Sequence, residues 1–190
     1  MPDDLWTAER VVAASNEWVW VPDGATSTRT DEVAFPIGPD LPGFGTPPDV
    51  QVRRVSDRET VADMLEVTAD GFGERDVAPE RHVAALNEAR RGLEDDSVGM
   101  LVAYVDGHPA GTGGWTLAGP VCRLWGGATH TRFRRRGAYR AALAERLRIT
   151  QKRGATLGLT HGVVDTSSPI LTGLGFARYG EERIVEQPLT

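Results

Sequence analysis

The residues best suited to chemistry lie in one segment, Thr129–Leu143, which reads THTRFRRRGAYRAAL. A helix is expected to begin at Gly137, directly behind an arginine-rich turn. The first amides of a helix lack internal partners and carry the positive end of the helix dipole. A glycine there lets a ligand approach the backbone, and guanidinium groups beside it add positive charge. The segment predicts a pyrophosphate site, while an arginine-coated helix start without a ligand remains the alternative.

Known phosphate-loop and metal patterns do not describe the chain. No Gly-Lys-Ser/Thr follows Gly137, as a Walker loop requires, and a single glycine does not make a dinucleotide-binding fingerprint. The only cysteine, Cys122, excludes a disulfide framework and is expected to be a small buried side chain. The four histidines lack the spacing of a metal site, so we expect no metal.

Composition indicates a globular chain of 190 residues, with 40% hydrophobic and 25% charged residues. No segment approaches the roughly 20 apolar residues of a membrane span, and the acidic N-terminus lacks a signal-peptide layout. We therefore expect a cytoplasmic protein that binds no membrane. The net charge of −6 disfavours general nucleic-acid binding. Residues 132–153 nevertheless hold nine Lys/Arg residues against one acid, Glu145, which favours a local anion site.

The elements that position this segment are expected in the order β-α-α-β-β-β-α-β-α-β. Strands are predicted at residues 50–55, 100–105, 110–117, 121–131, 156–163 and 178–186. Ser56–Glu59 matches a capping box that opens a helix reaching about Ala69. Pro79 begins a second helix whose inward residues are Val83, Leu86 and Leu93. Further helices are predicted over residues 137–153 and 167–174.

A stretch rich in glycine and proline, residues 38–49, is expected to be a linker. We expect an N-terminal extension with this linker over residues 1–48 and a main domain over residues 49–190. In the extension the pattern predicts a helix over Asp4–Ser15 and strands at Trp18–Val21 and Glu32–Ile37. Residues 1–37 are too few for a core of their own, so we expect them to pack on the main domain or across a homodimer.

Residues 50–190 resemble the GNAT (Gcn5-related N-acetyltransferase) superfamily. Arg134, Gly137 and Tyr139 fall on the three positions of its motif A, Arg/Gln-x-x-Gly-x-Gly/Ala. Ser168–Phe176, which reads SPILTGLGF, resembles its motif B. The spacing of the two motifs and the order of the elements also match. The resemblance implies an α/β (α+β) fold: a mixed, mostly antiparallel sheet with flanking helices, splayed between its fourth and fifth strands.

The resemblance also implies a reaction and a cofactor site. Acetyl-CoA (coenzyme A) would be the acyl donor, and the amine of a small molecule or peptide would attack its thioester directly. The backbone of the fourth strand would pair with the pantetheine arm, and an N–H near Thr129 would stabilise the oxyanion. The pyrophosphate would lie on the amides of residues 135–140, closest to Gly137. The cofactor-binding residues implied are Gly127, Ala128, Thr129, Arg134, Arg135, Arg136, Gly137, Ala138, Tyr139 and Arg140.

Two departures from the family pattern concern the acid that protonates the leaving thiolate. Leu171 stands where many relatives have a tyrosine in this role, so Ser168 or Tyr139 would have to replace it. Tyr139 itself stands where motif A usually has Gly or Ala. We expect its ring either to pack in the core, since Leu143 lies one helical turn away, or to line the cofactor cleft.

A third departure concerns the general base. Trp125 and Arg123 occupy positions where relatives often have a His or Glu. This leaves His161 either as the base or the residue that holds a water, or as a hydrogen-bonded strand histidine with no such role. These gaps keep open the alternative of a non-catalytic acyl-CoA-binding or regulatory domain with the same fold. Acceptor specificity is expected from the acidic stretch Ala69–Pro79, which favours a cationic amine. Trp115 and Trp125 are each expected either to line an aromatic site for the acceptor or to be core residues.

Overall fold

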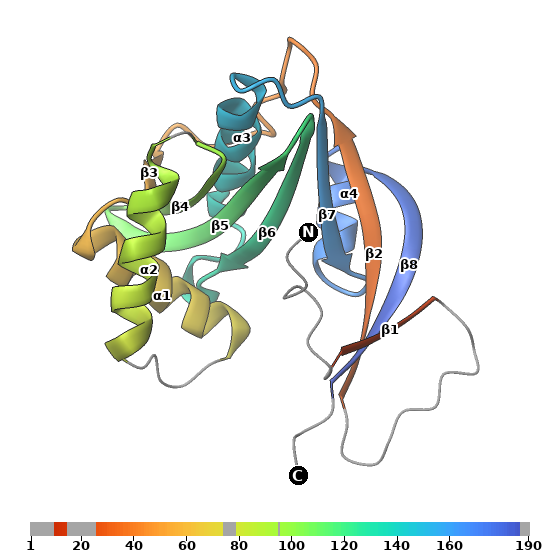
Figure 1. The fold of residues 1–190 in the computed structure, drawn as a ribbon, viewed down its shortest axis with the longest axis horizontal. Coiled ribbons are helices and arrows are strands. Elements are labelled where there is room, and N and C mark those ends of the chain that lie inside the picture. Colours follow the sequence, from red (N-terminus) through yellow and green to blue (C-terminus); the bar gives the residue numbers. More distant parts are fainter. Residues whose placement is uncertain (1–9, 15–25, 74–78, 95, 187–190) are drawn as a thin grey trace. The chain divides into compact units, whose positions relative to one another are not determined.

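The computed structural model describes residues 10–14, 26–73, 79–94 and 96–186 (Figure 1). The chain divides into two compact units. We call residues 36–158 the central unit, and residues 1–35 with 159–190 the terminal unit. The boundaries between the two compact units therefore lie at residues 35–36 and 158–159. The domain boundary at residues 48–49 that the sequence indicates stays a prediction.

Four antiparallel strands form the sheet of the central unit. They are β3 (Val50–Arg54), β4 (Val98–Val105), β5 (His108–Ala118) and β6 (Val121–Thr129), and each pairs with the next along the chain. Asp106 and Gly107 have φ of +52° and +79°, which fits the tight turn predicted between β4 and β5. The structure therefore confirms the predicted strands at 50–55, 100–105 and 110–117 to within a few residues.

Helices cover both faces of this sheet (Figure 1). Along β4, Val102 and Tyr104 pack with α1 (Arg58–Phe72), while Ala103 and Val105 pack with α3 (Ala138–Gln151). Successive strand side chains point to opposite faces, so this alternation places α1 and α3 on opposite sides. A second helix, α2 (Pro79–Gly92), packs on the α1 side through partly buried residues that include Leu86.

Two details of the helices differ from expectation. The N-cap of α1 is Asp57, one residue later than the predicted Ser56, and its carboxylate accepts from the Thr60 amide at 2.9 Å. In return, the Thr60 hydroxyl accepts from the Asp57 amide, so Thr60 has the role in the capping box that the sequence predicts for Glu59. Val83 on α2 and Leu93 just after its end are exposed, so the prediction that they face inward is wrong.

The glycine- and proline-rich residues 38–49, which we call the strap, pack along α3 rather than joining separate bodies. Near the C-terminal end of α3, the Gln151 side-chain amide donates to the Pro39 carbonyl at 3.1 Å and also to that of Gly38. Phe44, in the middle of the strap, is buried. Near the other end of α3, Pro47 lies against Gly137. The strap therefore reaches the turn in which the sequence predicts a pyrophosphate site.

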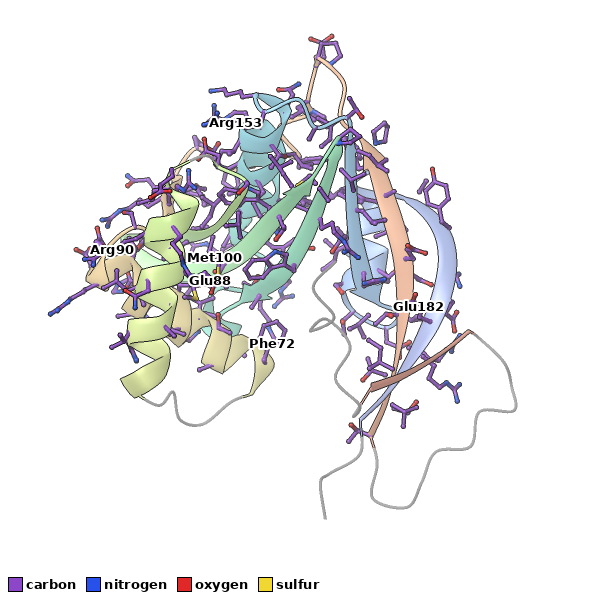
Figure 2. The ribbon with its side chains drawn as sticks, viewed as in Figure 1. Phe72, Glu88, Arg90, Met100, Arg153 and Glu182 are labelled. Carbon is purple, nitrogen blue, oxygen red and sulfur yellow. The ribbon has the colours of Figure 1, made fainter. Side chains whose placement is uncertain are left out.

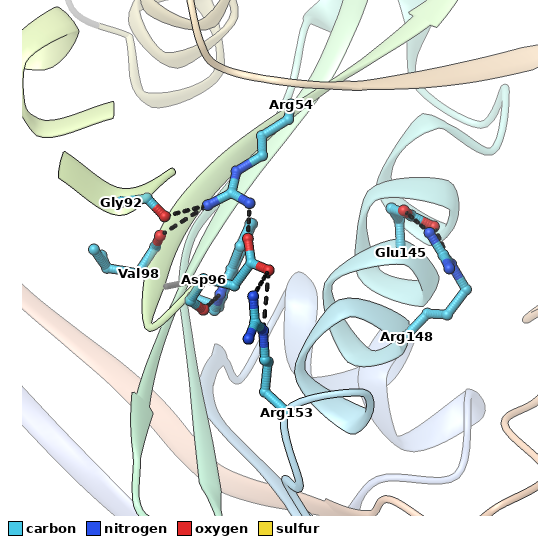
Figure 3. Close-up of polar contacts among 8 residues, drawn as sticks. Arg54, Gly92, Asp96, Val98, Glu145, Arg148 and Arg153 are labelled. Atoms are coloured by element: carbon cyan, nitrogen blue, oxygen red, sulfur yellow. Dashed lines mark hydrogen bonds and ion pairs between the residues drawn. The ribbon is translucent and has the colours of Figure 1, made fainter. Parts of the chain in front are cut away.

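A carboxylate holds three connections of the central unit together. Asp96, between α2 and β4, pairs with Arg54 at the end of β3 and with Arg153 after α3, the latter at 2.7 Å (Figure 3). Arg54 also donates to the carbonyls of Gly92 and Val98. Networks of this kind contribute more than isolated surface pairs, and this one fixes the ends of both helix layers.

The terminal unit joins the two ends of the chain. Its strands are β1 (Arg10–Ala14), β2 (Thr26–Pro36), β7 (Leu157–Val163), which begins in the central unit, and β8 (Ala177–Glu186). Both β1 and β2 pair antiparallel with β8. A short helix, α4 (Ser167–Gly173), precedes β8, and the rings of Phe35 and Phe176 meet with centroids 5.1 Å apart.

These pairings correct part of the N-terminal prediction. The predicted helix over Asp4–Ser15 is wrong for residues 10–14, which form a strand. Their Val-Val pair favours extended backbone, and β8 supplies a hydrogen-bonding edge that the local pattern could not reveal. The predicted strand at Glu32–Ile37 falls largely within β2, whereas Trp18–Val21 lies outside the described residues.

The predicted α/β fold class is confirmed, with mostly antiparallel strands flanked by helices. The splay expected between the fourth and fifth predicted strands stays a prediction. Among the helices in the described ranges, none is long and apolar enough to span a bilayer.

Candidate functional site

The candidate site is the connection from β6 to α3. A 3-10 turn over Thr131–Phe133 follows β6, and residues 134–137 then lead into α3. Arg135 and Gly137 have φ of +65° and +85°, and a non-glycine residue in this region is uncommon. The Gly137 carbonyl accepts the first helical bond, from the Ala141 amide at 3.0 Å. The amides of residues 138–140 therefore have no partner within the helix.

One side of Gly137 is closed by the strap. A β-carbon on residue 137 would lie 2.4 Å from Cδ of Pro47. Glycine is thus required here by its positive φ and by the strap, and that side of the residue is closed to a ligand. The predicted closest approach of the pyrophosphate to Gly137 stays a prediction, and the ligand would have to come from the opposite side of the residue. The amides of the following residues, Ala138 to Arg140, remain the candidates.

The arginines of the turn differ in how strongly they are engaged. Arg136 pairs with Asp106 at 3.2 Å and with Asp49 at 3.8 Å. Arg134, Arg135 and Arg140 are exposed. Within the described residues these three form no ion pair, nor does the exposed Arg132, so these four guanidinium groups are free to meet an anion.

Other arginines of the predicted basic segment, residues 132–153, are paired with carboxylates or buried. Arg148 pairs with Glu145 on the same helix, as Figure 3 shows, and Arg153 pairs with Asp96. Arg146 is 2% exposed and lies inside the central unit. Apart from Lys152 at the far end of α3, the exposed charges without an ion pair among the described residues of this segment lie in the turn and the first residues of α3.

Arg146 is buried because β6 carries a bulge. The β5–β6 register passes from Thr112↔Ala128 to Gly114↔Trp125, so two glycines of β6 lie opposite Gly113. A bulge leaves ladder groups unpaired. One guanidinium nitrogen of Arg146, Nη1, donates to the carbonyls of Gly114 at 3.1 Å and Trp125 at 3.4 Å.

Gly113 makes room for this guanidinium. A β-carbon on Gly113 would lie 2.6 Å from Cζ of Arg146. Burial lowers the pKa of Arg146 from its ordinary high value, and among the described residues it has no carboxylate partner. The guanidinium therefore stabilises the bulge in place of backbone pairing.

Tyr139 packs against the bulge from the α3 side. Its Cε2 lies 3.1 Å from the β-carbon position of Gly127, so the ring covers one face of that glycine. Burial raises the pKa of the Tyr139 phenol, and nearby Arg146 only partly opposes this. The hydroxyl thus stays protonated at neutral pH, and no hydrogen-bond partner for it occurs in the described part of the chain. Ala128, the next residue, is buried beside Gly71 of α1.

Asp70, at the end of α1, ties that helix to the candidate site. Its carboxylate accepts from the Thr131 amide at 2.5 Å and from the Thr131 hydroxyl at 3.0 Å. The backbone bond is the main reason that the pKa of Asp70 lies below its usual range. His130 Nδ1 lies 3.4 Å from the same carboxylate and accepts from the Arg132 amide. From the sequence, Asp70 is expected only to contribute to acceptor selection within residues 69–79, and no local pattern indicates its contact with Thr131.

The remaining predicted catalytic residues, His161 and Ser168, lie in the terminal unit. The Ser168 hydroxyl is buried and donates to Asp31 at 2.5 Å, and Arg178 lies 2.6 Å from the other oxygen of that carboxylate. His161 on β7 is largely exposed, and its Nε2 lies 3.5 Å from Glu182.

The sequence also predicts the environment of Cys122 and of the two tryptophans Trp115 and Trp125. Cys122 is buried, as predicted, and burial raises the pKa of its thiol. Trp115 is a core residue, whereas Trp125 is 38% exposed. Among the described residues no group of three acidic, histidine or cysteine side chains could hold a metal ion.

Residues 44–159 match the protein family described as "Acetyltransferase (GNAT) domain". A search of curated proteins finds no match. Among solved structures, a GCN5-related N-acetyltransferase from Sphaerobacter thermophilus is similar with a TM-score of 0.68 and 18% identity, over 88% of this chain and 55% of that one. One from Kribbella flavida has a TM-score of 0.61 and 22% identity, over 88% of this chain and 61% of that one.

A third similar structure carries a ligand. It is AAC(6')-Iy in complex with the bisubstrate analog CoA-S-monomethyl-acetylneamine, with a TM-score of 0.57 and 17% identity, over 67% of this chain and 90% of that one. At these identities the structural similarity establishes the fold alone. The chain also spans less than two thirds of the Kribbella and Sphaerobacter proteins.

Proposed function

The chain belongs to the GNAT acetyltransferase family, and from that premise we propose that it transfers an acetyl group from acetyl-CoA to a primary amine of a small molecule or peptide. The observation that carries the proposal is the first turn of α3. Its amides at residues 138–140 lack helical partners, and the exposed Arg134, Arg135 and Arg140 surround them. Such a helix start suits a pyrophosphate.

The residues present fit coenzyme A. The amides of Ala138, Tyr139 and Arg140 would bind the pyrophosphate, and the free arginines would reach the remaining phosphate. Arg136 would contribute less, because Asp106 and Asp49 already balance its charge. The backbone of Gly127, Ala128 and Thr129 would pair with the pantetheine arm. The bulge at Gly126 and Gly127 supports this assignment, because it removes those residues from regular pairing with β5.

When bound, acetyl-CoA supplies a thioester carbonyl: a C–N bond to the amine forms, the C–S bond breaks, and the thiol leaves. Tyr139 is the proposed proton donor for the leaving sulfur. Its phenol is protonated at neutral pH and lies over Gly127. Ser168 is the weaker candidate, because its hydroxyl already donates a hydrogen bond to Asp31.

His161 is the proposed base for the amine proton. Its imidazole is exposed, and the Glu182 carboxylate beside it would balance the charge gained with the proton. A similar protein, AAC(6')-Iy, binds a conjugate of coenzyme A with an aminoglycoside derivative. That complex supports an amine as the acceptor. The cytoplasmic location and the homodimer stay predictions.

The proposed cofactor site is tested by calorimetric titration with acetyl-CoA, CoA and ATP. We expect both CoA species to bind and ATP not to bind. Arg140→Ala should weaken CoA binding about threefold to tenfold, as loss of one exposed charge contact does. Arg148→Ala is the matched control, because Arg148 lies on the same helix but pairs with Glu145. Equal affinities of the two variants for CoA would place the cofactor elsewhere. No heat with CoA would contradict a coenzyme A site in this chain.

A further inference from the structure

A cavity of about 340 Å³ opens between the helices α1 and α2 and the sheet of the central unit. Its walls come from Met64 on α1, Ala85 and Glu88 on α2, Met100 on β4, and Trp125 with Gly126 on β6. Figure 2 labels Glu88, on the helix, and Met100, on the strand, and both line this cavity. The volume lies at the lower end of the range of about 300–1,000 Å³ common for ligand sites.

The lining is apolar with one charge. The only polar side chains among the lining residues are Thr68 and Glu88. The Thr68 hydroxyl is already engaged, since it donates to the Met64 carbonyl at 2.7 Å. Glu88 is exposed, and within the described residues it forms no ion pair. An occupant would therefore meet apolar walls, an indole ring and a single carboxylate.

The cavity ends at the proposed reaction centre. Trp125 and Gly126 line it, and Gly127 is the next residue of the same strand. Gly126 has φ of +60°, and a β-carbon there would lie 3.7 Å from Cε of Met100. The bulge thus connects the cavity, on the α1–α2 side, with the strand segment proposed for the thioester arm.

We propose that this cavity binds the acyl acceptor and that the acceptor is an amine with an apolar body, such as an arylalkyl or branched alkyl amine. The inference rests on the proposed function and specifies its substrate class. Apolar walls gain from burying a hydrocarbon body, and an indole face attracts both rings and cations. A polyhydroxylated amine would lose water from hydroxyl groups that find no partner here. The Glu88 carboxylate selects a cation over an anion of the same shape.

The first test is calorimetric binding of 2-phenylethylamine to the protein saturated with CoA. Two comparison ligands separate body from charge: 3-phenylpropionate has the same ring with an anionic end, and 3-amino-1,2-propanediol has the amine without an apolar body. We expect only 2-phenylethylamine to bind well, by about tenfold or more over either comparison ligand. Equal or tighter binding of the polar amine would overturn the proposal.

Two substitutions on α2 form a matched pair for the same titration. Ala85→Trp should fill the cavity and weaken 2-phenylethylamine binding about tenfold or more. Val83→Trp is the control, because Val83 is 63% exposed on the same helix and does not line the cavity. Glu88→Gln, at an exposed position that tolerates the change, should weaken binding about threefold to tenfold. Equal affinities for Ala85→Trp and Val83→Trp, or no effect of Glu88→Gln, would contradict the assignment.

Turnover separates failure of this inference from failure of the proposed function. All variants are first titrated with CoA, because Val83, Ala85 and Glu88 are not among the residues proposed to hold it. Acetylation of 3-amino-1,2-propanediol but not of 2-phenylethylamine would leave the acetyltransferase standing and reject the apolar acceptor. Binding of 2-phenylethylamine without its acetylation would also reject it as the acceptor class. Acetylation of 2-phenylethylamine that Ala85→Trp abolishes and Val83→Trp retains is the expected result.

Discussion

Pro47 occupies the space next to Gly137 in which the β-carbon of any other residue would lie. Its Cδ is 2.4 Å from that position, and Gly137 has φ of +85°. Two independent constraints therefore select glycine at the start of α3, one from backbone conformation and one from the strap. The glycine of motif A in this chain is a packing residue as well as part of a proposed cofactor site, and substitutions there must be interpreted accordingly.

The first prediction follows from this contact. Gly137→Ala should destabilise the fold by about 1–3 kcal/mol, because alanine resists a positive φ and its methyl group meets Pro47. In a Pro47→Gly background the same substitution should cost less, since the steric part is removed. Thermal and denaturant unfolding of the four proteins of this double-mutant cycle measure the coupling. Strict additivity of the two substitutions would show that the strap does not press on Gly137.

The second prediction concerns the arginine inside the central unit. Arg146→Met should destabilise by about 2–4 kcal/mol, because the carbonyls of Gly114 and Trp125 lose a buried donor. Arg148→Met, on the same helix, should change stability by less than about 1 kcal/mol, because Arg148 is exposed and pairs only with Glu145. Denaturant unfolding of both variants is the measurement. Equal effects would mean that Arg146 contributes no more than a surface arginine.

The third prediction is a dependence of stability on pH at Asp70. The folded protein holds the pKa of this carboxyl below its ordinary value of about 3.9, mainly through the Thr131 amide. Its stabilising effect is therefore complete above the ordinary pKa and is lost as the pH falls through the lower, folded pKa. Asp70→Asn should be less stable than the wild type at pH 7, and the difference should shrink below about pH 4. Chemical denaturation at a series of pH values tests this, and a difference that persists unchanged at pH 2 would contradict it.

The local patterns predicted much of the central unit. The Asp106-Gly107 turn fixes the β4–β5 hairpin, and Pro79 marks the start of α2, because both residue types act through their own backbone preferences. In both cases the deciding interactions lie within a few residues of one another. The start of α3 is only partly local, because Gly137 is selected by its own backbone conformation and also by Pro47.

The remaining errors have long-range causes. Residues 10–14 are a strand because β8, at the other end of the chain, offers them a partner. The buried state of Arg146 depends on a bulge between two other strands and on Gly113, so the sequence alone places it in the basic segment, residues 132–153. The role of Asp70 required knowing that the end of α1 lies beside Thr131. None of these contacts leaves a periodic pattern in the sequence.

The fourth prediction concerns the proposed proton donor. Tyr139→Phe should lower kcat for acetyl transfer by about 10²-fold, the lower end of what acid catalysis supplies, with little change in the KM for acetyl-CoA. Because burial raises the pKa of this phenol above its ordinary value of about 10, wild-type activity should show no loss from its ionisation between pH 7 and 9. Thiol release at saturating amine is the measurement. A kcat within twofold of the wild type, in a variant of normal stability, would leave the ring with a packing role only.

The most direct test of the central claim follows the acetyl group itself. The protein is incubated near pH 8 with acetyl-CoA labelled with ¹³C in the acetyl carbons, and with a panel of arylalkyl amines, polyamines, amino acids and short peptides. Mass spectrometry of the amines and a thiol assay of free CoA are read together. We predict a labelled N-acetyl product that forms in equal amount to the released CoA and depends on both protein and amine. CoA that binds but is released no faster than in buffer, with every amine in the panel unmodified, would contradict the account and favour a non-catalytic acyl-CoA-binding domain.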